Sequence, residues 1–262
     1  MAAQSDLTVS EDEVLVERRD GVQIITLNRP RAKNAVNANV AKAVAAAVDE
    51  LDADDELRAG VLTGAGGAFS AGMDLKAFLN GERPSVPGRG FCGITQAPPR
   101  KPMIAAVEGW ALAGGFEVML ACDLVVAGRS ARFGVPEVKR SLVAAAGGAL
   151  ELANRVPRAL ALEMLLTGDP IDAARAEAAG LVNRVVDDGT ALDVACELAA
   201  RIAGNGPLGV AASKRIVLES PGWGEDRWAR HDEIVAPVMS SEDAREGATA
   251  FAEKRDPVWR GR

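Results

Sequence analysis

The chain has 262 residues, 48% of them hydrophobic, which allows one large domain with a substantial buried core. Its net charge of −7 argues against a general nucleic-acid binder, because affinity for phosphate backbones depends on clustered lysine and arginine. No stretch approaches 18 consecutive apolar residues, and residues 1–6 lack the basic and apolar regions of a secretory signal. Composition therefore predicts a globular protein that works neither on nucleic acid nor in a membrane.

Cysteine and histidine usage narrows the chemistry. Cys92, Cys122 and Cys196 are odd in number and widely spaced, which favours reduced thiols in a reducing compartment over a disulfide framework or a zinc site. His231 is the single histidine, so a histidine-rich metal site is excluded, and no GxSxG motif supplies a serine nucleophile. We expect a cytoplasmic protein without a metal centre.

The first elements are two strands and a helix. Residues 14–17 and 22–27 predict short strands around the turn at Asp20-Gly21. Asn37 is a suitable N-cap for a helix that extends to about residue 51. Four apolar residues fall on one face of that helix and predict its buried side: Val40, Val44, Val48 and Leu51.

A glycine-rich turn follows the next strand. Residues 60–63 predict a buried strand that ends in Gly64-Ala65-Gly66-Gly67, which is similar to the start of a dinucleotide-binding fingerprint. Phe69 stands where that fingerprint requires glycine, so a nicotinamide cofactor is disfavoured. Residues 81–102 are rich in proline and glycine without a clear period, and predict a long surface loop that is a candidate mobile cover over a site.

Strands and helices alternate through the middle of the chain, and helices alone complete it. Predicted strands cover residues 103–107, 123–127 and 181–186, and predicted helices cover 114–121, 144–153, 158–166 and 172–179. After residue 190 the pattern is helical, with a break at Asn205-Gly206-Pro207. This order predicts an α/β core followed by an all-helical tail.

The most informative feature is a pair of glutamates twenty residues apart, each beside a backbone-exposing turn. Glu117 follows Gly114-Gly115, and Glu137 follows Gly134-Val135-Pro136. Considered alone, Glu117 is as readily an ordinary helix acid as a functional group, and Glu137 is more readily a surface acid. Together they equip a site to move protons near a carbonyl, because burial brings a glutamate pKa toward working pH. Backbone N–H groups supply the means to hold an enolate oxygen.

Five ordered segments carry a family resemblance. The chain resembles the enoyl-CoA hydratase/isomerase (crotonase) superfamily over nearly its full length, most of all an enoyl-CoA hydratase. The segments are Leu27-Asn28-Arg29-Pro30 with Asn34-Ala35, residues 69–75, 109–123 and 133–137, and Phe251-Ala252-Glu253-Lys254-Arg255. The resemblance implies the α/β class, with a spiral of ββα repeats over residues 1–199 and a C-terminal helical trimerisation region over 200–262.

The resemblance also implies roles for particular residues. Glu117 and Glu137 correspond to the catalytic carboxyl groups, and the N–H groups of Met73 and Gly114 correspond to an oxyanion hole. The implied partner is an acyl-CoA thioester substrate. No cofactor is implied, since coenzyme A is part of the substrate, and the implied assembly is a homotrimer or a dimer of trimers.

The implied substrate-binding residues are less sharply marked by the sequence. One set lies in the loop near the nucleotide end of coenzyme A, a second lies along the pantetheine path, and a third lies in the tail. The residues are Arg31, Lys33, Ala35, Ala71, Asp74, Leu75, Lys76 and Lys254, with Arg255 beside it. Since the chain is acidic, local basic groups have to attract the anionic coenzyme.

Two glutamates favour hydration of a trans-2-enoyl-CoA over double-bond migration, because other branches of the family lack one of the two. One departure weakens this preference: Ala144-Ala145 stand where hydratases carry Pro-Gly before the pair that matches Gly147-Gly148. A Δ3–Δ2-enoyl-CoA isomerase or a carnitinyl-CoA-type dehydratase is therefore an alternative. A non-catalytic binding protein that touches RNA is a third, disfavoured by the acidic charge and by the complete catalytic set.

Overall fold

The computed structural model describes residues 12–262; the N-terminal stretch interpreted above as lacking a secretory signal lies outside them. A six-stranded sheet forms the centre, in the order β1-β2-β3-β6-β8-β11. Its strands are β1 (Val14–Arg19), β2 (Val22–Leu27), β3 (Ala59–Gly64), β6 (Met103–Val107), β8 (Leu124–Gly128) and β11 (Arg184–Val186). Only β1 runs antiparallel to its neighbour. The predicted strands are confirmed, although the last one begins at residue 184 instead of 181.

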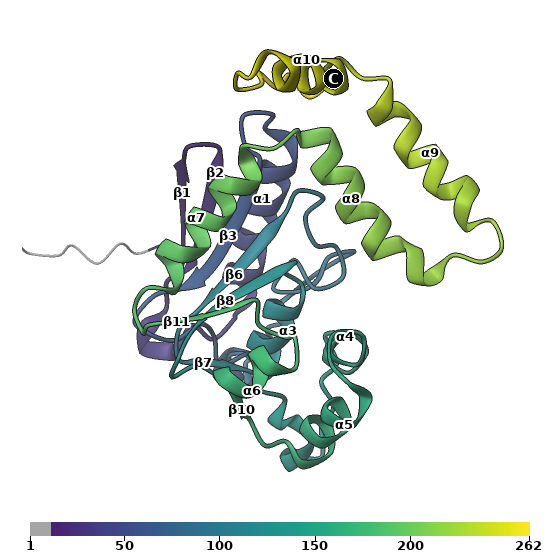
Figure 1. Ribbon diagram of the computed structural model, residues 1–262. Helices are drawn as coiled ribbons and strands as arrows, with labels where there is room; N and C mark the ends of the chain where they lie inside the picture. The colour runs from purple at the N-terminus through teal and green to yellow at the C-terminus, as the bar shows by residue number, and fades with distance from the viewer. Residues whose placement is uncertain (1–11) are drawn as a thin grey trace, which may run out of the picture.

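Helices cover both faces of this sheet (Figure 1). Alternate residues of each strand point to opposite faces, so Ile25 and Leu62 pack toward α1 (Ala38–Ala53), while Ile24 and Val61 pack toward α7 (Ala191–Ala203). The α1 face is the one predicted from helical spacing, and the Asn37 side chain caps the helix by accepting a hydrogen bond from the Val40 N–H. Burial on both faces explains why the strands read as continuous apolar runs.

Each spiral turn adds a short strand to a second sheet before the chain returns. The three strands of this sheet are β7 (Trp110–Leu112), β9 (Arg132–Gly134) and β10 (Ile171–Asp172), in the order β10-β9-β7. Thus β6 leads through β7 into α3 (Gly114–Leu120), and β8 leads through β9 into the 3₁₀ helix η2 (Pro136–Arg140). The expected ββα repeats are confirmed, and they bring the starts of α3 and η2 to the same side of the molecule.

Three helices follow η2: α4 (Gly148–Arg155), α5 (Arg158–Thr167) and α6 (Ala173–Ala178). The prediction that α4 begins at residue 144 was wrong. Gly147 has φ of +110°, a left-handed conformation that an α-helix cannot include, so the helix starts only at the next residue. Residues 144–147 form a turn, and their backbone N–H groups remain available to other partners.

The segment between α2 (Leu75–Leu79) and β6 is more ordered than its composition suggests. It contains a small antiparallel pair, β4 (Ser85–Val86) and β5 (Gly90–Phe91). The prediction of a surface loop over residues 81–102 was wrong for residues 90–94, which are buried and end in Ile94, while residues 80–83 are exposed. Positive φ angles at Gly90 and Cys92 turn the chain inward here, which a period-based reading of the sequence cannot detect.

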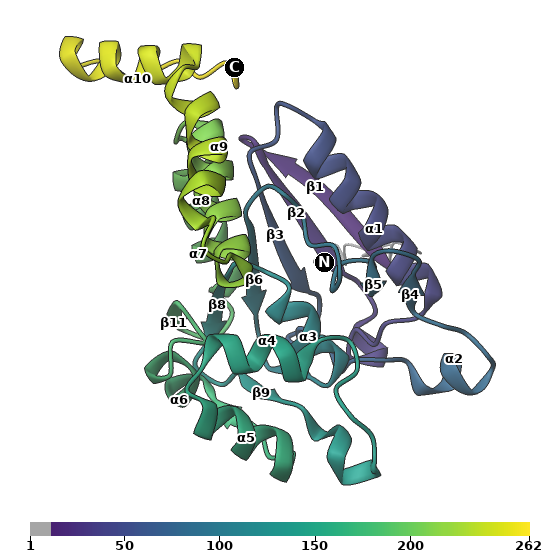
Figure 2. The same ribbon diagram turned by 90° about the vertical axis from the view of Figure 1, so that its right-hand side faces the viewer.

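The chain ends in helices that extend away from the sheet (Figures 1 and 2). They are α8 (Pro207–Glu219), η3 (Ser220–Gly222), α9 (Arg227–Met239) and α10 (Glu242–Glu253), which with the final residues we call the C-terminal arm, 206–262. The expected division at 199/200 falls inside α7, which packs on the sheet, so we propose the boundary at the Asn205-Gly206 break instead. No helix in residues 12–262 has the length and apolarity needed to cross a membrane.

Candidate active site

The first wall of the site is the turn over residues 70–74. Val36 donates a hydrogen bond to the Gly72 carbonyl (2.8 Å), and Asp74 donates one to the Val36 carbonyl (2.9 Å). Ser70 Oγ accepts from the Gly72 N–H (3.1 Å). The Met73 N–H, between these bonds, has no partner in residues 12–262. This donor therefore remains available to a ligand.

The second wall is the start of α3. Ala113 has φ of 50° and ψ of −130°, a strained conformation for a residue with a Cβ. It directs the first helical N–H, that of Gly114, away from the helix, and this N–H also lacks a partner in the described part of the chain. A Cβ added to Gly72 would lie 2.9 Å from Gly114 N, so the two walls are in close contact. The two expected oxyanion donors thus belong to neighbouring backbone segments.

Glu117 lies one turn into α3 and is 5% exposed. Its Oε1 accepts hydrogen bonds from the N–H groups of Ala146 (2.7 Å) and Gly148 (2.9 Å), in the turn before α4. Burial raises the pKa of Glu117 and the charge of Glu137 raises it further, while these hydrogen bonds oppose the rise. The two carboxyl groups therefore interact electrostatically, as a pair that handles protons would.

Glu137 approaches from η2, where Pro136 occupies the first position and fixes the entry of the chain. Its Oε2 is buried and has no hydrogen-bond partner among the described residues. Burial raises the pKa of Glu137, with the charge of Arg140 opposing the rise. A buried carboxyl oxygen without a partner is costly unless a ligand or a proton satisfies it, so this carboxyl group is suited to carry a proton.

The structure brings most predicted substrate-binding residues to the same wall. Arg31 and Lys33 are exposed in the loop after β2, and the Lys33 carbonyl accepts the Ala71 N–H (3.0 Å). Leu75 and Lys76 are exposed at the start of α2. Basic groups are therefore available near the oxyanion turn, on the loop where a coenzyme nucleotide was expected.

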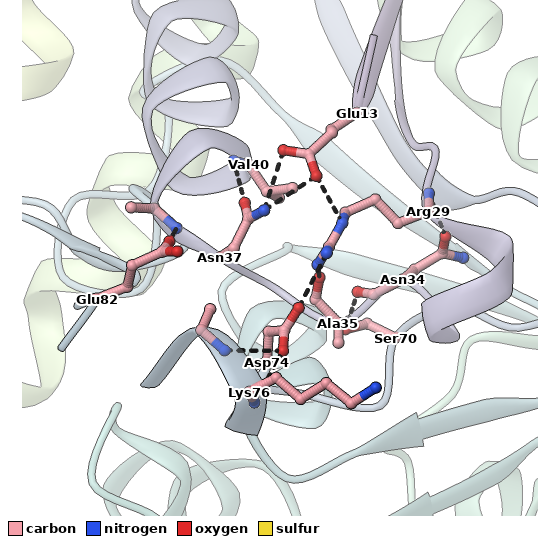
Figure 3. Close-up of polar contacts among 12 residues, drawn as sticks. Glu13, Arg29, Asn34, Ala35, Asn37, Val40, Ser70, Asp74, Lys76 and Glu82 are labelled. Atoms are coloured by element: carbon pink, nitrogen blue, oxygen red, sulfur yellow. Dashed lines mark hydrogen bonds and ion pairs between the residues drawn. The ribbon is translucent and has the colours of Figure 1, made fainter. Parts of the chain in front are cut away.

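Two predicted residues have other partners, and a third lies far from the oxyanion turn. The Asp74 carboxylate pairs with Arg29 (2.9 Å) and caps α2 by accepting from the Lys76 N–H (3.0 Å), as Figure 3 shows. Lys254 directly follows α10, and α10 lies at the opposite end of the molecule from α2 (Figure 2). Arg255 is paired with Glu246 (2.6 Å). Within one chain, then, the tail residues do not join the site.

Several contributors were absent from the sequence-based site. The N–H donors of Ala146 and Gly148 hold Glu117, yet a backbone donor leaves no side-chain signal in a sequence. Phe91 covers Gly114 so closely that a Cβ there would lie 2.6 Å from its ring. In the sequence, the apolar run at residues 91–94 was the indication that this segment is buried near the site. Arg29 belongs to the segment Leu27-Asn28-Arg29-Pro30, but the sequence alone indicated no role for this residue.

The site lacks a metal-binding arrangement: no group of three or more His, Cys, Asp or Glu side chains in residues 12–262 is placed to hold an ion. A cavity of about 1290 Å³ lies elsewhere, between the C-terminal arm and the core residues Asp123, Arg155 and Leu181. Neither Glu117 nor Glu137 lines it. The cavity is therefore a feature of the arm and not of the carboxyl pair.

The fold and the site together define an α/β protein that presents one buried and one partly buried carboxyl group beside two backbone donors without a partner in residues 12–262. The family model described as enoyl-CoA hydratase/isomerase matches residues 17–262, and the chain belongs to that family. It is 44% identical to enoyl-CoA hydratase EchA19 of Mycobacterium tuberculosis, over 97% of this chain and 98% of the relative.

One further relative and one crystal structure support this family membership. The chain is 44% identical to the carnitinyl-CoA dehydratase of Salmonella paratyphi A, over 91% of this chain and 94% of that protein. A crystal structure of enoyl-CoA hydratase from Mycobacterium tuberculosis H37Rv superposes with a TM-score of 0.94 at 56% identity, covering 95% of this chain and 99% of the other. The expected crotonase-type fold is thereby confirmed.

Proposed function

We propose that this protein is an enoyl-CoA hydratase that reversibly adds water to a trans-2-enoyl-CoA thioester. The observation that carries the proposal is the placement of Glu117 and Glu137 with the unpartnered N–H groups of Met73 and Gly114. Carboxyl groups with raised pKa values supply acid and base, and the two N–H groups supply a site for developing negative charge. Relatives named for hydration and dehydration of CoA thioesters support the same chemistry.

In this proposal the thioester oxygen accepts hydrogen bonds from Met73 and Gly114. Glu117, whose Oε1 is held in place by two backbone donors, removes a proton from water as the water oxygen bonds to the β-carbon. The double-bond electrons move toward the thioester and form an enolate. Glu137, whose buried Oε2 favours the protonated form, gives its proton to the α-carbon. Proton transfer between the two carboxyl groups through water restores the starting state.

The proposal includes no separate cofactor, because these groups account for both proton transfers and for the enolate charge. Coenzyme A enters as part of the substrate, with Arg31, Lys33 and Lys76 as its proposed anion-binding residues beside the backbone of Ala35, Ala71 and Leu75. The free cysteines Cys92, Cys122 and Cys196 fit a reducing compartment, and we propose a cytoplasmic location.

We infer that the active assembly is a homotrimer or a dimer of trimers. The C-terminal arm leaves large apolar side chains uncovered, among them Trp228, Met239 and Phe251 at 66%, 71% and 88% exposure. Large exposed apolar surfaces of this kind indicate protein contacts. In such an assembly Lys254 reaches the coenzyme of a neighbouring copy instead of its own. Light scattering should give three or six times the 27.2 kDa chain mass; a monomer at working concentration would contradict the assembly.

One observation favours a second function, dehydration of a carnitinyl-CoA-like hydroxyacyl thioester or Δ3–Δ2 isomerisation. Ala144 is buried against the Gly148 position, where a Cβ would lie 3.0 Å from its methyl group, and Ala146 donates to Glu117. The side chains at 144–146 therefore border the base. Product analysis with 2-enoyl, 3-enoyl and hydroxyacyl thioesters separates these reactions from hydration.

The first test follows the conjugated thioester absorbance of crotonyl-CoA. Wild type should consume it, and Glu117→Gln and Glu137→Gln should each lose about 10²-fold or more in kcat, the usual contribution of a positioned acid or base. Glu219→Gln is the matched control, because Glu219 is an exposed helix acid paired with Arg215. A folded wild type without turnover of any enoyl thioester would refute hydration.

A further inference from the structure

Arg29 lies beside the oxyanion turn with every arm of its guanidinium engaged. Its Nε pairs with Glu13 Oε1 (2.7 Å), its Nη2 pairs with Asp74 Oδ2 (2.9 Å), and its Nη1 donates to the Ala35 carbonyl. Its backbone N–H donates to Asn34 Oδ1 (2.9 Å). Figure 3 shows the side chain between Glu13 and Asp74. Each nitrogen of the guanidinium therefore has a protein partner, and these contacts fix the orientation of the group.

The two contacts of Arg29 on the site side hold the two segments that form the bridge between Val36 and Met73. Asp74 directly follows Met73, and its N–H bonds to the Val36 carbonyl (2.9 Å), while the Val36 N–H bonds to the Gly72 carbonyl (2.8 Å). Ala35, which accepts from Arg29, directly precedes Val36. One guanidinium therefore fixes both partners of the short bridge whose remaining free donor is the Met73 N–H.

Both oxygens of the Asp74 carboxylate already accept hydrogen bonds from the protein. Oδ2 accepts from Arg29, and Oδ1 accepts from the N–H groups of Lys76 (3.0 Å) and Ala77 (3.2 Å). Burial raises the pKa of Asp74, but the hydrogen bonds from Ala77, Arg29 and Lys76 outweigh burial and hold it below its usual range. The carboxylate remains charged and orients the turn.

Stability alone is a poor explanation for this network. The Arg29, Glu13 and Asp74 side chains are 19%, 30% and 14% exposed, so their charges lose much of their hydration. Ion pairs removed from water contribute little net stability, because the cost of desolvation offsets their attraction. An arginine fork that serves three acceptors at once is suited to a geometric role.

We propose that Arg29 is a positioning residue for the Met73 N–H of the oxyanion hole, acting through the Asp74 carboxylate and the Ala35 carbonyl. The inference rests on the proposed function, since it assigns Met73 to the thioester oxygen. It also replaces the expectation that Asp74 contacts coenzyme A: Asp74 shapes the turn from behind.

The test compares Arg29→Lys and Asp74→Asn with wild type. Lysine keeps the charge, but its donors leave a single nitrogen and cannot reproduce the planar fork that reaches Glu13, Asp74 and Ala35. Asparagine retains an N-cap oxygen for α2 while it loses the charge that pairs with Arg29. Each variant should lower kcat by about 10- to 100-fold, because a displaced donor costs less than the ~10²- to 10³-fold of a lost one. KM should change by less than about threefold, because ground-state binding is spared.

A bound chromophore supplies a readout that a purely structural role would not change. A dienoyl-CoA thioester absorbs at longer wavelength when donors polarise its carbonyl, so its red shift on the protein reports the oxyanion hole. We expect the red shift in wild type and a clearly smaller shift in Arg29→Lys and Asp74→Asn. The shift requires binding but no turnover, so it is scored independently of hydratase activity.

Two controls separate position from stability. Arg175→Lys breaks an exposed two-arm pair with Glu163 (2.7 and 2.8 Å) away from the oxyanion turn, and it should keep the wild-type band. Glu13→Gln weakens the other side of Arg29, keeps Asp74, and should reduce the red shift less than Asp74→Asn does. Thermal unfolding of each variant reports its effect on the fold.

The possible outcomes separate failure of this inference from failure of the hydratase proposal. The inference is overturned if Arg29→Lys or Asp74→Asn folds and keeps both the wild-type red shift and the wild-type kcat. This holds even where the unfolding temperature falls. Absence of any red shift in wild type also overturns it, because Met73 then polarises no carbonyl. A wild-type red shift without turnover overturns the hydratase proposal alone, and the variants still score the inference. If Arg29→Lys fails to fold, Asp74→Asn carries the test.

Discussion

The oxyanion turns and the C-terminal arm differ in how closely one chain packs them. Around Met73 and Gly114 the backbone segments lie so close that a Cβ at Gly72 would press on Gly114 N at 2.9 Å. In the arm, by contrast, the large apolar side chains of Phe251 and Met239 are 88% and 71% exposed. The difference teaches that one chain completes the chemistry-bearing turns by itself, whereas the arm requires another surface to complete it.

The largest effect is expected from Gly72→Ala, which tests the close packing of the oxyanion turns. Gly72 has φ of +92°, and an added Cβ would meet Gly114 N, so the variant strains its own backbone and displaces an oxyanion donor. We expect a loss of about 10²- to 10³-fold in kcat, the range for a lost oxyanion donor. Gly88→Ala is the control, since Gly88 has φ of +74° with nothing within 4 Å. Equal losses in both variants would show that backbone strain alone explains the effect.

A smaller effect is expected where Glu117 meets the turn before α4. In Gly148→Ala the new Cβ would lie 3.0 Å from Glu117 Cγ and 3.1 Å from Oε1, which pushes the carboxylate by a few tenths of an ångström. Misplacement on this scale should lower kcat by about 10-fold, since displacement by 1 Å costs about 10²-fold. Gly209→Ala, in the open helix α8, should keep activity. Steady-state kinetics that show full activity in Gly148→Ala would mean that Glu117 tolerates movement.

The pH dependence of stability tests whether the buried carboxyl groups are strained. Burial raises the pKa of Glu137 in the folded state, so its contribution to stability is complete below the unfolded pKa of about 4.3 and is lost as pH rises through the folded pKa. Glu137→Gln removes this penalty. Urea unfolding should therefore show the variant gaining stability over wild type as pH rises from about 4 toward neutrality. A pH-independent difference would mean that the carboxyl group is not penalised by burial.

The smallest expected effect concerns Lys254 in the exposed C-terminal arm. Lys254 is exposed at the end of α10, so Lys254→Ala should leave the thermal unfolding of the fold unchanged. If Lys254 meets a coenzyme phosphate in a neighbouring copy, KM should rise about three- to tenfold, the scale of one partly screened charge contact. Lys42→Ala, an exposed lysine of α1, is the matched control. Equal KM values for both variants would remove Lys254 from the site.

Much of the core was readable from the chain because local rules and tertiary packing agree there. The alternation and helical spacing around Ile24, Val44 and Val61 placed the sheet and α1 correctly. Predictions failed where glycine geometry overrides pattern: Gly147 delays α4, and Gly90 turns an apparent surface loop inward. Period-based reasoning detects faces, but it does not detect a left-handed residue that redirects the chain.

The same division holds for the site. The sequence by itself marked Glu117 and Glu137 as candidate catalytic groups beside backbone-exposing turns, and the family resemblance of its motifs proposed the N–H groups of Met73 and Gly114 as oxyanion donors. Only the tertiary structure decided how those groups are held: two backbone donors on Glu117, a buried oxygen on Glu137, and Arg29 spanning Glu13 and Asp74. The physical reason is that hydrogen-bond donors and desolvation belong to positions in space, and residues far apart in the sequence create them.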